Sequence, residues 1–161
     1  MNAGVSDKLL GAAAECRLHA DILAEALLEH GDVRYSADEV PQLERARLRM
    51  LDQMAYRYTK LQSTLGERLL PLMLELTEEP IAPDAAFSQK LQRLERLRII
   101  PSADQWRTFR QTRNALAHEY PDAPEIKAAL LNHFIGSVGE LVEFWRHVEQ
   151  RISQLVRMQG V

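Results

Sequence analysis

The sequence predicts an all-α protein, on the strength of two observations. Apolar residues recur every three or four positions along most of the 161 residues, which is the period of an amphipathic helix. Runs of valine, isoleucine and threonine, which favour β-strands, are missing. A chain of this length suits one hydrophobic core, so we expect a single domain over residues 1–161, built as an up-and-down bundle of about five helices.

The first helix is expected from Ser6 to His30. Serine is a frequent N-cap because its hydroxyl accepts a hydrogen bond from an unpaired amide of the first turn. Gly31 follows, and glycine readily adopts the left-handed conformation that ends many helices. The apolar stripe between these two signals contains Leu9, Leu10, Ala13, Ala20, Leu23 and Leu27.

A second helix is expected after a polar link over residues 31–38. Asp38 can cap this helix, and Pro41 suits its first turn, where the amide hydrogen that proline lacks would have no partner. The apolar pattern then continues over a long stretch, but Gly66 and Pro71 fall inside it. We therefore expect the helix to kink or break there.

A loop is expected once this apolar pattern ends near Thr77. The segment over residues 78–84 contains two prolines, which favour turns over helix. A third helix is expected over residues 84–98, with its apolar side chains at helical spacing. Those side chains are Phe87, Leu91, Leu94 and Leu97.

The fourth helix is expected from Ala103 to Glu119. Ser102, with Gln105 three residues later, resembles a capping box at its start. The helix should end before Pro121, because proline disfavours the helical conformation of the residue that precedes it. A last helix of about 34 residues follows, and its apolar stripe is long enough to brace the whole bundle.

Composition excludes several classes of protein. With 20 basic and 23 acidic residues, the net charge of -3 argues against bulk electrostatic binding to nucleic acid or membranes. The single cysteine, Cys16, forms neither an intrachain disulfide nor a cysteine-based metal site. No secretory signal is expected, since Asp7 and Lys8 interrupt the first apolar run, and no stretch is apolar enough to span a bilayer. We expect a soluble, cytoplasmic protein without a cofactor.

The segment Arg113 to Tyr120, RNALAHEY, places several reactive side chains near the expected end of the fourth helix. Asn114 lies one helical turn before His118, so we expect the two side chains on the same face of this helix. Arg113 and His118 are separated by roughly 140° around a regular helix, so they do not share one narrow face. Either the long Arg113 side chain reaches around the helix, or a second copy of the chain supplies the complementary residues.

A site shared by two copies suits the cleavage of RNA. Attack by a ribose 2′-hydroxyl on its own phosphate needs a base, an acid for the leaving 5′-oxygen, and cations that stabilise the phosphorane. A histidine with an unperturbed pKa of about 6.5 can serve as acid or base near neutrality. Two chains related by a two-fold axis would bring two His118 and two Arg113 into one cleft, with no metal required.

Two blocks of the sequence, residues 56–71 and 87–122, resemble one HepT-like branch of the HEPN superfamily of toxin ribonucleases. The blocks cover about a third of the chain and include the Arg-x4-His spacing of Arg113 and His118. The resemblance implies a HEPN-like helical bundle that forms a homodimer, and a metal-independent endoribonuclease that acts as the toxin of a toxin-antitoxin system. It assigns Arg113 and His118 as the catalytic pair and Asn114 as the residue that positions the phosphate or the histidine.

Tyr120 matches the tyrosine that lies two residues past the histidine in these proteins. There, a nucleotidyltransferase antitoxin of the MNT type attaches AMP to the tyrosine, which implies the same partner and modification here. An added phosphodiester would place negative charge next to Arg113 and block the site of the RNA backbone. From the residues alone, Tyr120 is equally an ordinary amphipathic side chain whose ring packs and whose hydroxyl reaches water.

The basic and aromatic residues of the fourth helix have two interpretations each. Arg107 and Arg110 continue the row of Arg113 at steps of three, so they can guide an RNA backbone, or form a solvated face paired with acids such as Asp104. Trp106 and its neighbour Phe109 can stack on bases, but aromatic residues at this spacing more often belong to the core.

Two other classes of function stay open on the sequence. One is a catalytically silent HEPN protein that serves as the binding partner or substrate of a nucleotidyltransferase. The other is a structural helical bundle in which RNALAHEY carries no chemistry. Metal enzymes and ATPases are disfavoured, because the sequence contains no His-x3-His pair, no Glu-x-x-His pair and no phosphate-binding glycine motif.

Overall fold

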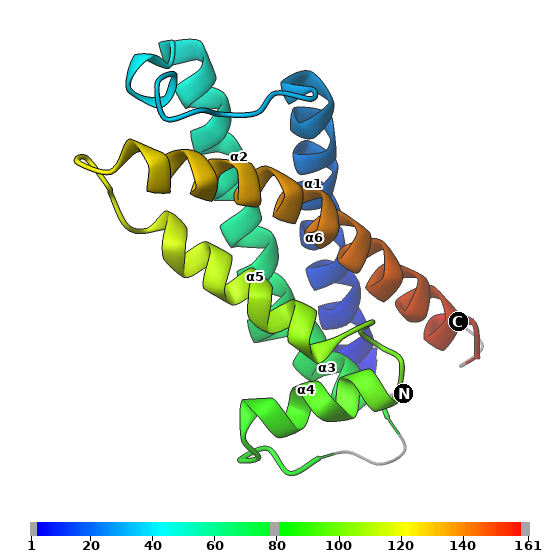
Figure 1. Cartoon of the computed structure of the whole chain (residues 1–161). Helices are drawn as coiled ribbons and strands as arrows, with labels where there is room; N and C mark the ends of the chain where they lie inside the picture. Colours follow the sequence, from blue (N-terminus) through cyan, green and yellow to red (C-terminus); the bar gives the residue numbers. More distant parts are fainter. Residues whose placement is uncertain (1–2, 78–80, 159–161) are drawn as a thin grey trace.

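A computed structural model describes residues 3–77 and 81–158, and all regular structure in these residues is helical. The all-α prediction is therefore confirmed. Figure 1 shows the arrangement of the helices. The α-helices are α1 Ala3–His30, α2 Arg45–Thr64, α3 Leu70–Glu75, α4 Phe87–Arg96, α5 Ala103–Leu116 and α6 Pro124–Met158, with a 3-10 turn η1 Val40–Gln42 and a π-helical segment η2 Leu65–Leu69.

The long helices alternate in direction. α1 and α2 pack side by side, α5 runs back along α2, and α6 crosses α1 and α5 (Figure 1). Because α2, η2 and α3 follow one another without a loop, they form one continuous rod, and the described residues make up five rods in all. An up-and-down bundle of about five helices is what the sequence predicts.

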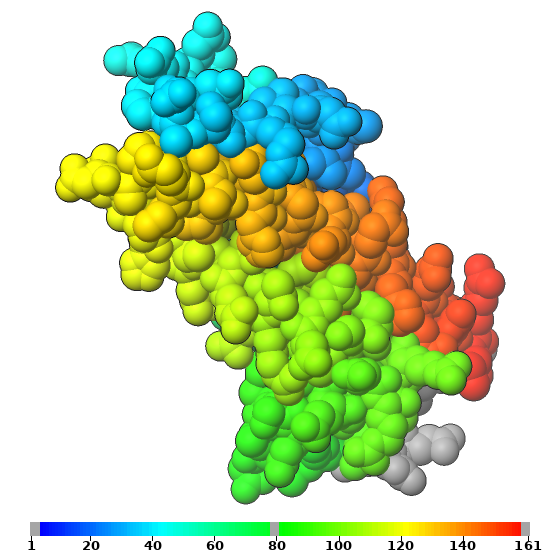
Figure 2. Space-filling view, viewed as in Figure 1, coloured from blue at the N-terminus to red at the C-terminus, as the bar shows by residue number. Residues whose placement is uncertain are grey.

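One hydrophobic core joins α1 through α6 and contains most of the large aromatic side chains. Trp106 and Phe109 are 2% and 0% exposed, so the core interpretation of these two residues is confirmed. Phe144 packs against both of them, edge-to-face against Phe109 with ring centroids 5.4 Å apart. This contact fixes α5 against α6. A smaller apolar cluster lies under the link between α1 and α2, which covers one end of the bundle in Figure 2.

For α1, the predicted C-terminal end is right and the predicted N-terminal end is wrong. Gly31 has φ +66° and its amide bonds to the Leu27 carbonyl at 3.1 Å, so it ends the helix as expected. The expected N-cap at Ser6 is wrong, because the helix already includes Ala3. Neither Gly4 nor Val5 interrupts the helix before Ser6, and a serine inside a helical run does not start a new helix.

The start of α2 also differs from the prediction. Pro41 lies in the 3-10 turn η1, Asp38 lies in a turn before it, and α2 begins only at Arg45. Contacts with α6 explain the delay, since the Asn132 side chain bonds both the amide (2.8 Å) and the carbonyl (2.9 Å) of Tyr35. This bidentate contact ties the link to α6 and overrides the local capping signals.

Gly66 and Pro71 neither break nor end the second rod. Gly66 lies in η2, where the wider π-helical turn replaces the regular register, and Pro71 follows in α3. The expected break is therefore wrong, and the irregularity at Gly66 is a π-helical segment within a continuous helical run. The proline-rich loop prediction is only partly testable, because residues 78–80 lie outside the described residues. The third helix is shorter than expected, with α4 over Phe87–Arg96.

The prediction for α5 is right at its start and wrong at its end. The Ser102 hydroxyl accepts a hydrogen bond from the Gln105 amide at 3.1 Å, as a cap should. The helix then ends at Leu116 instead of Glu119. The amide of His118 bonds the carbonyl three residues before it, a tighter pattern that closes the last turn early. α6 has 35 residues, close to the expected length.

Candidate functional site around Arg113 and His118

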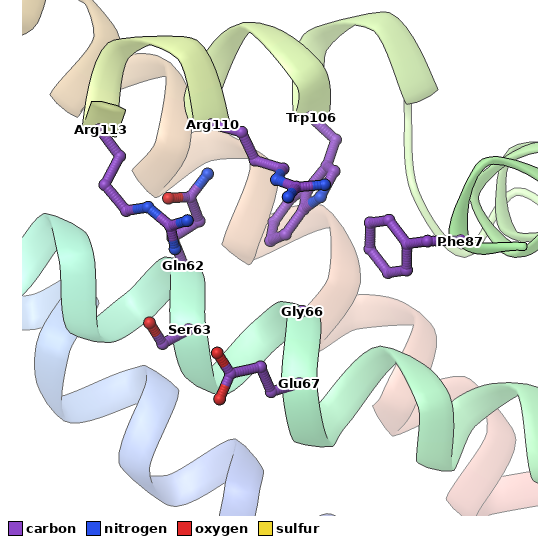
Figure 3. Close-up of a pocket in the computed structure, with 8 residues that line it drawn as sticks. All are labelled: Gln62, Ser63, Gly66, Glu67, Phe87, Trp106, Arg110 and Arg113. Atoms are coloured by element: carbon purple, nitrogen blue, oxygen red, sulfur yellow. The ribbon is translucent and has the colours of Figure 1, made fainter. Parts of the chain in front are cut away.

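Arg113 lies in the last turn of α5 and lines a pocket of about 280 Å³ between α2 and α5. In Figure 3 the side chains of α5 reach toward α2, and Phe87 of α4 closes one side. We call this space the arginine pocket. Its lining consists of Gln62, Ser63, Gly66, Glu67, Phe87, Trp106, Arg110 and Arg113.

Gly66 determines how closely α5 approaches α2 at this pocket. A Cβ atom at Gly66 would lie 2.8 Å from Cζ2 of Trp106, which is too short for a non-bonded contact. The glycine and the π-helical turn around it thus let the indole ring lie against the backbone of η2. The ring then forms one wall of the arginine pocket, on the side away from Arg113 (Figure 3).

The hydroxyl of Tyr58 on α2 fixes the position of α5 through hydrogen bonds to α5 and α6. It bonds Oγ of Ser137 on α6 at 2.8 Å and donates to the carbonyl of Phe109 on α5 at 3.3 Å. Burial raises the pKa of Tyr58 to about 12, so the phenol stays protonated and able to donate. Thr112 adds a second link, since its hydroxyl lies 3.1 Å from Nε2 of His133 on α6.

The three arginines of α5 do not act as one row. Arg107 pairs with Asp104 at 2.6 Å and takes no part in the pocket, which matches the solvated-face interpretation for this residue. Arg110 lies over the ring of Phe87, with its guanidinium carbon 5.6 Å from the ring centroid. Arg113 is half-buried and pairs with no acid among the described residues. Two of the three positive charges therefore converge on the arginine pocket.

His118 lies beyond the end of α5, where it is exposed and lines a second pocket of about 140 Å³. We call this the histidine pocket. Tyr120 is half-buried and lines it too, together with Asp52 of α2 and Lys127 of α6. Glu119, between the two motif residues, pairs with Lys127 at 3.2 Å. The histidine and tyrosine of the motif therefore belong to one site.

Arg113 and His118 line different pockets of the same chain, and no hydrogen bond joins them in the described structure. The expectation that Asn114 shares a helical face with His118 is wrong, because α5 ends between them. Asn114 is exposed, and its carbonyl accepts the amide of Ala117 in the closing turn. The motif thus divides at the helix end into an arginine half and a histidine half.

Gln62 and Asp52 are among the pocket residues that sequence reasoning missed. A signal for Gln62 exists, because it lies four residues after Tyr58 and four before Gly66, on the buried face of α2. A glutamine there interrupts an apolar stripe. Asp52 carries no comparable signal, since it is an exposed acid on a helix and only the approach of the residues after α5 places it near His118.

The described residues contain no group of three or more His, Cys, Asp or Glu side chains arranged to hold a metal ion. Within the same residues, none of the helices combines the length and the apolar character that crossing a membrane requires. Comparisons of the chain with protein-family models, curated proteins and solved structures return no match. The two pockets and the motif that they share are therefore the features of the chain that bear on its function.

Proposed function

We propose that the protein is a metal-independent endoribonuclease and the toxin of a toxin-antitoxin system that acts in the cytoplasm. The observation that supports this most strongly is the state of Arg113, a half-buried guanidinium without an acidic partner beside a second arginine. Two arginines against one exposed acid, Glu67, leave the pocket with a net positive charge, so the site favours an anionic ligand. The backbone of RNA supplies one at every residue.

His118 supplies the proton transfer in this proposal. The ring is exposed, and no described side chain occupies its nitrogens, so both are accessible to substrate. Since Arg113 lies in the other pocket of the same chain, we place the reaction in a homodimer whose two-fold axis brings two His118 and two Arg113 into one cleft. One His118 takes the proton from the 2′-hydroxyl, and the other gives a proton to the leaving 5′-oxygen. The arginines stabilise the phosphorane.

The supporting experiment compares purified wild-type protein with three variants on total cellular RNA in the presence of EDTA. Arg113→Ala and His118→Ala should abolish cleavage, while Arg49→Ala, an exposed arginine of α2 outside both pockets, should leave it unchanged. Circular dichroism checks that helical content is the same in all four proteins. Cleavage by the His118→Ala protein would refute the catalytic assignment.

Regulation by an MNT-type nucleotidyltransferase antitoxin is part of the same proposal. Tyr120 shares the histidine pocket with His118, so an AMP group on its hydroxyl would block access to the histidine and repel RNA. Tyr120→Phe should keep ribonuclease activity and lose AMP incorporation from ATP. Intact mass spectrometry after incubation with a candidate nucleotidyltransferase measures the modification.

The second candidate function is the catalytically silent partner or substrate of a nucleotidyltransferase. The separation of Arg113 and His118 within one chain favours it, because a monomer with this structure lacks a complete site. If wild-type protein cuts no RNA and yet accepts AMP on Tyr120, the silent partner is the better description.

A further inference from the structure

The arginine pocket contains polar atoms that the fold leaves without partners. Gln62 is 1% exposed, and neither its amide nitrogen nor its amide oxygen has a hydrogen-bond partner among the described residues. The indole nitrogen of Trp106, a residue 2% exposed, is also unpaired. Buried polar groups are nearly always paired in folded proteins, and each unpaired one costs about 1–3 kcal/mol. Three of the six unpaired buried side-chain atoms of the described residues belong to two residues that line this one pocket, which favours a ligand there.

The chemistry of the lining indicates the kind of ligand. The Gln62 amide points from α2 toward α5, between Arg113 and Trp106 (Figure 3). The amide has a donor NH2 group next to an acceptor oxygen. It therefore matches an aromatic heterocycle that presents one acceptor and one donor on the same edge, as adenine does with N7 and its N6 amino group. Phe87 offers a ring for stacking, and it already carries the Arg110 guanidinium on one face. The pocket thus combines a hydrogen-bonding edge with aromatic contact.

The positive charge at the pocket indicates that the ligand carries a phosphate group as well as a heterocycle. Arg110 is exposed at the rim and Arg113 is half-buried, and the acidic residue of the lining, Glu67, is exposed on the α2 side. A volume of about 280 Å³ is close to the lower end of the range of small-molecule sites, about 300–1,000 Å³. This is the scale of one small ligand.

We propose that the arginine pocket is an adenine-nucleotide subsite. Gln62 reads the adenine edge, Phe87 packs on the base, and Arg113 turns toward the phosphate and thereby uncovers the Gln62 amide. The proposal deepens the ribonuclease assignment, on which it rests for RNA as a source of the nucleotide. Adenosine 5′-monophosphate and an adenine residue of RNA share this chemistry, and the experiment separates them.

Two-dimensional NMR of 15N-labelled protein provides a direct test, because the chain has two tryptophans and hence two indole N–H signals. Trp106 lines the arginine pocket and Trp145 does not. Titration with AMP should move the Trp106 signal saturably and leave the Trp145 signal in place. GMP, CMP and UMP should bind about tenfold more weakly, the discrimination expected of one bidentate amide contact.

Substitutions at Gln62 and Arg110 test base recognition and phosphate binding separately. Gln62→Leu should abolish the preference for AMP, whereas Gln53→Leu, an exposed glutamine of the same helix, should not change it. Arg110→Ala should weaken all four nucleotides to a similar extent and keep the preference. Both Gln62→Leu and Arg110→Ala should retain the wild-type melting temperature within a few degrees, because neither removes a hydrogen bond of the described structure.

Three results would overturn the subsite. They are the absence of a saturable shift with any nucleotide, an equal response to inorganic phosphate, and an unchanged AMP preference in Gln62→Leu. A 2′-O-methylated adenine-containing tetranucleotide, which cannot be cleaved, should displace AMP if RNA is the natural source, and should fail to displace it if the free nucleotide is. RNA cleavage without AMP binding would reject the subsite alone, and AMP binding without cleavage would reject the ribonuclease alone.

Discussion

Helices α2 and η2 contact α1 on one side and α5 on another. The two contacts differ in how many of their polar side chains have hydrogen-bond or ion-pair partners. Toward α1, Glu15 accepts hydrogen bonds from Thr64 at 3.1 Å and Arg68 at 2.5 Å, and Arg57 lies 3.1 Å from the His19 ring. We call these five residues the α1–α2 polar cluster. Toward α5, the arginine pocket leaves Gln62 unpaired and Arg113 without an acid.

This difference suggests that the α1–α2 polar cluster serves stability and that the arginine pocket serves function. In the α1–α2 polar cluster, Glu15 is paired with the Arg68 guanidinium and the Thr64 hydroxyl, which lower the pKa of Glu15, while one nitrogen of His19 and one of Arg57 have no hydrogen-bond partner among the described residues. In the arginine pocket, both polar atoms of the Gln62 amide are unpaired and Arg113 forms no ion pair with a described acid, and such groups are the kind that sites retain for a ligand. Changes in the cluster should therefore alter stability and spare activity, and changes in the pocket should do the reverse.

The largest effect is expected at the two motif residues. Arg113→Ala and His118→Ala should each lower RNA cleavage by at least about a hundredfold, since each removes charge stabilisation or proton transfer from the transition state. Melting temperatures should change little, because neither residue pairs with another described side chain. Single-turnover cleavage and thermal melts measure the two quantities. A large loss of stability in either variant would break the proposed separation.

A substitution beneath the pocket should affect stability as well. Gly66→Ala places a methyl group 2.8 Å from the buried Trp106 ring, so α5 must shift away from η2. Overpacking of this kind costs about 1–3 kcal/mol, and chemical denaturation measures it. Gly11→Ala is the matched control, because nothing lies within 4 Å of a Cβ there. Equal stability of the two variants would show that the glycine does not set the position of α5.

A smaller effect is expected from removing one charge at the rim of the arginine pocket. Arg110→Ala should weaken RNA binding and reduce the slope of log affinity against log salt by about one, as the loss of one phosphate contact does. Arg107→Ala should leave the slope unchanged, since Arg107 is already paired with Asp104. Binding isotherms at several salt concentrations compare the two. A slope change in Arg107→Ala alone would reverse the assignment.

The smallest effect concerns pH and the α1–α2 polar cluster. Burial, followed by the charge of Arg57, lowers the pKa of His19 below its ordinary value of 6.5. The unfolded chain then binds the proton at higher pH than the folded chain, so this contribution to stability is complete above about pH 6.5 and declines as the pH falls further. His19→Leu should flatten the fall in unfolding free energy between about pH 7 and 5. A variant with the wild-type slope would contradict this.

Local signals explain which parts of the structure the sequence predicts. Gly31 and Ser102 act through their own backbone and hydroxyl, so both helix ends appear where expected. The start of α2 depends on Asn132, which is remote in sequence, and capping rules do not contain that contact. The apolar period predicts the core, including Trp106 and Phe109, because burial follows helical spacing.

The candidate site is predictable only in its residue types. RNALAHEY identifies Arg113, His118 and Tyr120 as chemically notable, but the early end of α5 at Leu116 decides which pocket each one lines. That end depends on hydrogen bonds of the closing turn, whereas the prediction relied on Pro121 alone. Arg113, Gln62 and Gly66 line one pocket because α2 and η2 pack against α5, and no local sequence pattern contains that packing.

The central claim is that the arginine half and the histidine half of the motif work together across a two-fold axis. Subunit mixing tests it most directly. Wild-type protein is mixed with a ninefold excess of His118→Ala protein under exchange conditions, and native mass spectrometry verifies the heterodimers. If one cleft needs both His118 residues, RNA cleavage per wild-type chain should fall about tenfold, because nearly every wild-type chain then has a variant partner. Unchanged cleavage per wild-type chain would show that one His118 is enough and would contradict the mechanism in which one His118 acts as base and the other as acid.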